Sequence, residues 1–111
     1  MLVSRSSPFG GRSRTLVLLA LSLLEESFPR ELSRILEVPL FSVQQALRGL
    51  EIDGLVAGHS AGRTRLYRLN PRYFARAELQ QYLRRLAVPE EKLLERIGGL
   101  RKRPRRAGKP L

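Results

Sequence analysis

The sequence predicts an α+β domain that is mainly helical and carries one small β-hairpin. Three apolar patterns of helical period come first, and an alternating segment bounded by glycines follows them. A further helical pattern lies beyond the hairpin, so we expect an additional C-terminal helix. The 111 residues, of which 42% are hydrophobic, suffice for one small domain with one core.

The first helix is expected over residues 14–26, with Ser13 as its N-terminal cap. Its centre, LVLLALSLL from Leu16 to Leu24, is apolar nearly all round, so several of its faces should be buried. A membrane span takes about 20 apolar residues, and a signal peptide needs a small-residue cleavage pattern. The run has neither property, so we expect a buried helix and no membrane partner.

The second and third helices follow closely. Pro29 suits the first turn of a helix over residues 29–37, in which Glu31 is assigned to the exposed face. Pro39 ends this helix, because the residue before a proline is pushed out of the helical region. The third helix is expected over residues 40–53 with a C-terminal cap at Gly54. Its inner stripe has i, i+4 and i+7 spacing and consists of Val43, Leu47 and Leu50.

The hairpin is predicted from two short strands, residues 55–58 and 64–69, with Gly58, Ser60 and Gly62 supplying the turn. A fourth helix is expected over residues 73–86. Glu90 and Glu91 open a fifth, weaker helix, which the pair Gly98-Gly99 should end.

These patterns divide the chain into four segments. We expect a flexible arm over residues 1–12 and the helical and hairpin domain over residues 13–72. A C-terminal helical segment takes residues 73–99, and a basic, disordered tail takes residues 100–111.

Charge and composition narrow the function. The formal net charge is +11, and most of the cations are arginine, whose planar fork suits phosphates and guanine edges. Nucleic acid is therefore the first partner to consider, before an anionic membrane surface. The chain has no cysteine, which excludes disulfides and thiolate metal sites. It also has no carboxylate pair, Ser-His-Asp set or phosphate-binding glycine loop in a plausible context, so we expect no enzyme, no metal and no cofactor.

The order of three helices and a hairpin is that of a winged helix-turn-helix. Its third helix fits the major groove, where glutamine can pair with adenine and arginine with guanine. The hairpin, or wing, can place arginines on phosphates or in a narrow minor groove. The predicted DNA-binding residues are Ser42, Gln44, Gln45, Arg48, Arg63 and Arg65.

Residues 9–69 resemble bacterial and archaeal winged-helix regulators of the ArsR/MarR-like type. The resemblance rests on FGGRSRTLVLLALSL, FPRELSRILEV, FSVQQALRGLEIDGLV and GRTRLYRLNP, in that order. It implies a cytoplasmic, nucleoid-associated, prokaryotic transcriptional regulator, usually a repressor, that binds double-stranded DNA. Residues 40–53 would be the recognition helix and residues 58–65 the wing. The cysteine motif of metal-sensing relatives does not carry over, and the sequence identifies no small-molecule effector.

The fourth helix has more apolar surface than one small domain needs, and in the resembling proteins a terminal helix pairs two subunits. A homodimer is therefore expected, with the alternative that the stripe packs back onto the first helix. The predicted dimerisation residues are Phe74, Leu79, Tyr82, Leu83 and Leu86.

Three questions stay open at this stage. Phe41 is interpreted as a core residue at the start of the recognition helix, with contact to a thymine methyl group as the alternative. The arginine surplus and the tail also suit a non-specific or architectural nucleic-acid binder. A winged-helix module that binds proteins is the third function class, because a fold does not dictate a function.

Overall fold

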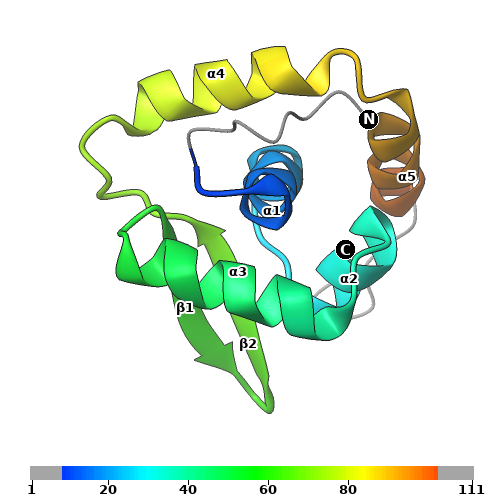
Figure 1. Ribbon diagram of the computed structural model, residues 1–111. Coiled ribbons are helices and arrows are strands. Elements are labelled where there is room, and N and C mark those ends of the chain that lie inside the picture. Colours follow the sequence, from blue (N-terminus) through cyan, green and yellow to red (C-terminus); the bar gives the residue numbers. More distant parts are fainter. Residues whose placement is uncertain (1–8, 103–111) are drawn as a thin grey trace.

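The computed structural model describes residues 9–102. Within them lie five helices and one two-stranded antiparallel sheet, as the sequence predicts (Figure 1). The elements in chain order are α1 (Arg12–Leu24), α2 (Pro29–Leu36), α3 (Leu40–Ile52), β1 (Val56–Ala61), β2 (Thr64–Leu69), α4 (Arg76–Ala87) and α5 (Glu91–Lys102).

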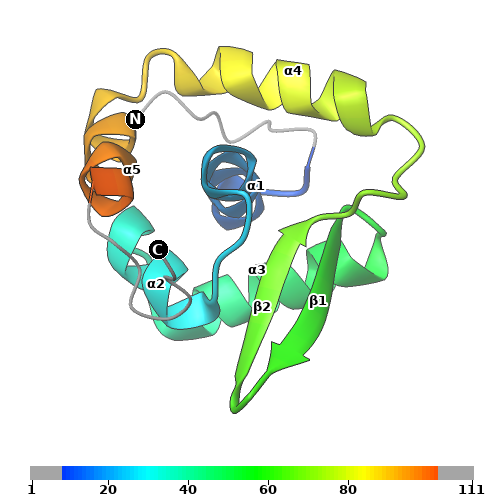
Figure 2. The ribbon, with the colours of Figure 1, turned by 180° about the vertical axis from the view of Figure 1, so that it is seen from behind.

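Helix α1 runs through the middle of the fold, with α3 on one side and α4 on the opposite side (Figures 1 and 2). Every residue from Leu16 to Leu21 is at most 1% exposed. This burial confirms the prediction drawn from the all-round apolar run, because a helix without a polar face must be covered on every side. No helix among residues 9–102 is long and apolar enough to cross a membrane.

The start of α1 differs from the prediction. Its N-cap is Gly11, and Ser13 is the second residue of the helix. Gly10 and Gly11 have φ angles of 103° and 144°, a region that glycine adopts without steric cost. The chain therefore turns into the helix at the glycine pair, two residues before the expected cap. The Thr15 hydroxyl donates a hydrogen bond to the Gly11 carbonyl at 2.9 Å.

Three residues, 37–39, connect α2 to α3, as expected of a helix-turn-helix. Glu37 has a left-handed backbone with φ 56°, and Pro39 forms the N-cap of α3. Arg96 of α5 reinforces this turn. Its Nη1 donates to the Ile35 carbonyl at 2.6 Å, and its Nη2 lies 2.8 Å from a Glu37 carboxylate oxygen. The guanidinium thus satisfies a carbonyl that the end of α2 would otherwise leave unpaired.

The prediction that Glu31 lies on the exposed face of α2 is wrong. Glu31 is only 9% exposed, and it accepts a hydrogen bond from the buried Ser27 hydroxyl. Ser27 also exchanges two backbone hydrogen bonds with Tyr67, so the segment between α1 and α2 pairs with β2. The hairpin is therefore anchored to the helical body at Ser27.

The hairpin is longer than the sequence predicts, because β1 continues past Gly58 and Ser60 to Ala61. Its turn is the pair Gly62–Arg63, and Gly62 has a φ of 66°. A positive φ at the first central residue is what a type II′ hairpin turn requires. The tip of the hairpin projects away from the helices, past α3 (Figure 2).

The C-terminal helices belong to the same core as the rest of the fold. Leu79 and Leu83 of α4, together with Leu93 and Ile97 of α5, are buried in one cluster with the α1 leucines. Helix α5 passes through Gly98-Gly99 and continues to Lys102, contrary to the predictions that the glycine pair ends it and that a disordered tail begins at residue 100. The rest of the predicted tail, and residues 1–8 of the predicted arm, lie outside the described residues. A glycine pair weakens a helix by about 1 kcal/mol per residue but does not terminate it when other contacts hold the helix in place.

This difference gives a stability prediction. Gly98→Ala should raise the free energy of unfolding by about 0.5–1 kcal/mol, because an added Cβ has open space and alanine is the better helix former. Gly54→Ala is the matched control. Gly54 has open space too, but its φ is 83°, so alanine there should cost about 1–2 kcal/mol. Urea denaturation followed by circular dichroism measures both changes. A stabilised Gly54→Ala protein would contradict the left-handed turn after α3.

Candidate nucleic-acid interface

The outer face of α3 carries most of the predicted DNA-binding residues. Gln44, Gln45 and Arg48 are exposed, and Ser42 is half-buried. The opposite stripe of Val43, Leu47 and Leu50 is buried, as predicted. No segment within residues 9–102 covers the outer face, so these polar side chains are open to a partner.

The prediction that Phe41 belongs to the core is wrong. The Phe41 side chain is 69% exposed on the outer face of α3, and Ile52 at the other end of the helix is 79% exposed. The physical reason is the helical period. Phe41 precedes the buried Val43 by two residues, which places it about 200° away around the helix. Ile52 has no place in the sequence prediction, although the same period could have found it.

Arg65 joins the wing to α3. Its Nη2 lies 2.9 Å from a Glu51 carboxylate oxygen and donates to the Gly58 carbonyl at 3.2 Å. Its guanidinium carbon lies 5.6 Å from the centre of the Tyr67 ring, within the range of a cation–π contact. A Cβ at position 58 would lie 2.9 Å from Arg65 Nε and from the Tyr67 ring, so the glycine makes room for both side chains.

These contacts give Arg65 a second role. The hydrogen bond and the negative charge of Glu51 raise the pKa of Arg65 above its ordinary value. The side chain is cationic at neutral pH with or without this contact, as every arginine is. Arg65, a predicted DNA contact, also ties the wing to α3, in addition to the anchor at Ser27. An arginine has five N–H donors, so Arg65 keeps donors for an anion.

Arg63 lies at the tip of the wing. It is exposed in the two-residue turn at the tip of the hairpin. This position matches the predicted role of a cation that reaches a phosphate or a minor groove.

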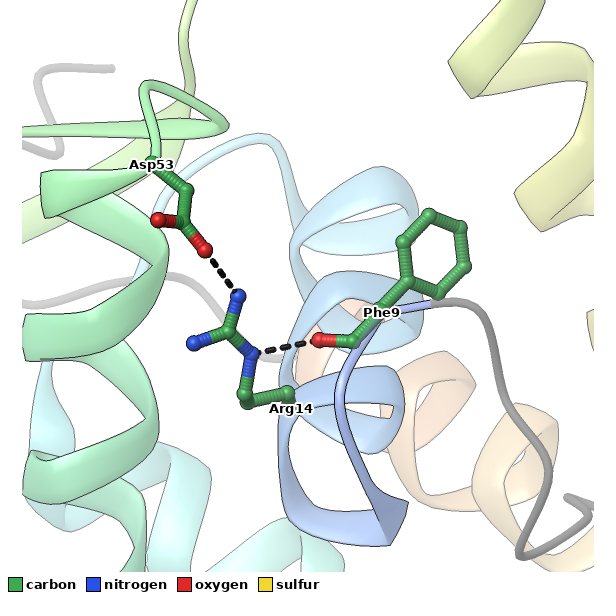
Figure 3. Close-up of polar contacts among 3 residues, drawn as sticks. All are labelled: Phe9, Arg14 and Asp53. Atoms are coloured by element: carbon green, nitrogen blue, oxygen red, sulfur yellow. Dashed lines mark hydrogen bonds and ion pairs between the residues drawn. The ribbon is translucent and has the colours of Figure 1, made fainter.

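Arg14 braces the end of α3, and Figure 3 shows its guanidinium between Phe9 and Asp53. Its Nη2 pairs with the Asp53 carboxylate just after α3, and its Nε donates to the Phe9 carbonyl. The guanidinium lies across Gly49, where a Cβ would collide with Arg14 Nη1. Sequence reasoning missed this brace, because Arg14 and Asp53 are 39 residues apart.

The two ion pairs change the charge of the interface. Glu51 and Asp53 are the acidic residues at the end of α3, and each would repel a nearby phosphate. Both carry an arginine partner, so their charges are compensated locally. Arg48 then contributes a positive charge on the outer face, and its Nη1 donates to the Gln45 side-chain oxygen at 3.1 Å.

A cleft of about 440 Å³ lies between the start of α1 and the first turns of α3. Ser42 and Gln45 line it from α3, and Arg12 and Ser13 line it from α1. Ser42, which is predicted to face DNA, thus sits at the border between the outer face and this cleft.

The residues predicted to form a dimer interface divide into two groups. Leu79 and Leu83 are buried in the chain's own core, and Leu86 packs against that core. These three residues follow the alternative to dimerisation, in which the apolar stripe of α4 packs back onto α1. Phe74 is 91% exposed and Tyr82 is 44% exposed, and the Tyr82 ring lies 5.8 Å from that of Phe9.

The outer face of α3 and the wing carry side chains that can form hydrogen bonds and ion pairs. Amide and guanidinium donors on α3 lie between two arginine braces, and a cationic wing tip extends beyond them. Within residues 9–102, no three histidine, aspartate or glutamate side chains gather as a group that could hold a metal ion. A comparison of the sequence with models of protein families and with curated proteins finds no match.

Proposed function

We propose that this protein is a sequence-specific regulator of transcription that binds double-stranded DNA. Helix α3 enters the major groove, and the wing contacts the backbone or the minor groove. The observation that supports this best is the exposure of Gln44, Gln45 and Arg48 on an uncovered helix face beside a wing with arginine at its tip. Such a protein acts as a repressor by occupying a promoter, which requires no chemistry of its own.

The proposal includes a homodimer. Two copies related by a two-fold axis would present two recognition helices about 34 Å apart, one turn of DNA. Of the five predicted dimerisation residues, Phe74 and Tyr82 are the two that are exposed and can contact a second copy.

Selection of preferred sites from random duplex DNA tests the proposal. We expect the protein to enrich one short sequence, repeated with a spacing of about 10 base pairs if the dimer is correct. A variant that carries both Gln44→Ala and Arg48→Ala should enrich it less, although it keeps the wing. Equal retention of all duplexes by the wild-type protein would contradict sequence-specific recognition.

Non-specific binding is the second candidate, because 21 Lys and Arg residues face only 10 Asp and Glu residues. Its affinity would come from counterion release and would be the same for every duplex. In the selection it would give retention without enrichment. A module that binds another protein would bind duplex DNA only in the non-specific range, so it too would give no enrichment, and a tight protein partner would distinguish it from the second candidate.

A further inference from the structure

The outer face of α3 has two large apolar side chains that have no role in the proposed recognition by polar residues. Phe41 and Ile52 are 69% and 79% exposed. They are eleven residues apart, which is close to three full turns of an α-helix, so they lie on the same side. Gln45 and Arg48 fall between them on that side. The outward stripe of α3 therefore has apolar ends and a polar middle.

The distance between the two side chains limits the kind of partner. Eleven residues of helix rise by about 16 Å, so Phe41 and Ile52 do not form one continuous apolar patch. Protein interfaces usually centre on such a patch, with polar groups at its rim. Here the order is reversed, because the polar pair occupies the centre and the apolar groups occupy the ends.

The major groove of DNA offers the matching chemistry. Its floor displays hydrogen-bonding edges, and the C5-methyl group of thymine is the apolar feature among them. At 3.4 Å per base pair, 16 Å along a helix lying in the groove corresponds to about five base pairs. The stripe carries the positive charge of Arg48, and the acidic residues beside it, Glu51 and Asp53, are paired with arginines. Its charge therefore complements that of a nucleic acid.

We infer that Phe41 and Ile52 determine part of the sequence specificity by contacting the methyl groups of two thymines about five base pairs apart. The inference rests on the proposed function, because it assigns a base preference to the same helix face. The predicted target is a duplex with a thymine near each end of the segment whose bases Gln45 and Arg48 contact.

Replacing thymine with uracil tests the inference, because uracil keeps every hydrogen-bonding group and lacks only the methyl group. The duplex is the one that site selection recovers, and each thymine is replaced in turn. Binding should weaken about fourfold at two positions about five base pairs apart, the factor expected for burying one methyl group. Phe41→Ala should abolish the sensitivity at one position, and Ile52→Ala should abolish it at the other.

Val88→Ala is the matched control. Val88 is also 69% exposed, but it lies at the end of α4, on the other side of α1 from α3. This variant should keep both uracil effects. Thermal melting of all three variants should match the wild type, because each substitution removes an exposed side chain.

Failure of this inference and failure of the proposed function give different results. If the wild-type protein prefers the selected duplex but binds it equally well with uracil at every position, the methyl contacts are refuted and the proposed function stands. If selection recovers no preferred duplex, the proposed function itself fails. Unchanged uracil sensitivity in both the Phe41→Ala and Ile52→Ala proteins would also overturn the inference.

Discussion

Truncating Leu83 to alanine should lower the free energy of unfolding by about 2–5 kcal/mol. Leu83 is fully buried on the side of α4 that packs against α1. The truncation removes apolar contacts and leaves a cavity, and the core around α1 is too closely packed to fill that cavity completely. Domains of this size are stable by about 5–15 kcal/mol, so this one change removes a large fraction of the total.

The neighbouring residue provides the control. Tyr82 is 44% exposed and contacts the Phe9 ring, so Tyr82→Ala should cost about 1 kcal/mol. Urea denaturation at two protein concentrations measures both variants. The loss at Leu83 should not depend on protein concentration, because the contacts lie within one chain. A Leu83→Ala protein that unfolds like the wild type but no longer forms dimers would show instead that this residue belongs to a subunit interface.

Replacing Arg48 should reduce discrimination between the preferred duplex and a single-base variant about 5- to 150-fold. An arginine that contacts a guanine through two hydrogen bonds contributes about 1–3 kcal/mol of discrimination. Arg48 is exposed, and its Nη1 bond to Gln45 leaves the other guanidinium donors available for a base. Quantitative gel-shift titrations of wild-type and Arg48→Ala proteins against both duplexes measure the ratio.

Two further variants separate base contact from net charge. Arg48→Lys keeps the charge but loses the planar fork, so it should retain affinity and lose most of the discrimination. Arg84→Ala removes the same charge from the exposed surface of α4 and should leave the discrimination unchanged. If Arg48→Ala weakened binding to every duplex by the same factor, Arg48 would be a phosphate contact and not a base reader.

Much of the interface could be predicted from the sequence because its signals are local. The inner stripe of α3 follows from residue spacing, and the exposure of Gln44, Gln45 and Arg48 follows from the same spacing. The period also places Phe41 outside, although the apolar nature of its side chain suggests the core. Where the two disagree here, the position on the helix decides which way the side chain points.

Other features could not be predicted because they join residues far apart in the chain. Arg14 and Asp53 meet only because α1 crosses α3, and Arg96 reaches the end of α2 only because α5 packs beside it. In the same way, Arg65 pairs with Glu51 only after the wing folds against α3. Nothing in the spacing of these residues indicates which arginine pairs with which acidic group.

The sequence by itself determined the order of the elements, the buried central helix and the inner face of α3, because apolar periodicity, prolines and glycines act over a few residues. The tertiary structure decided which apolar residues of α4 are buried in the chain's own core and which arginines form ion pairs. It also decided that a glycine pair stays inside α5. These outcomes depend on packing between distant segments, whose free energies exceed the local preferences of about 1 kcal/mol that a sequence pattern expresses.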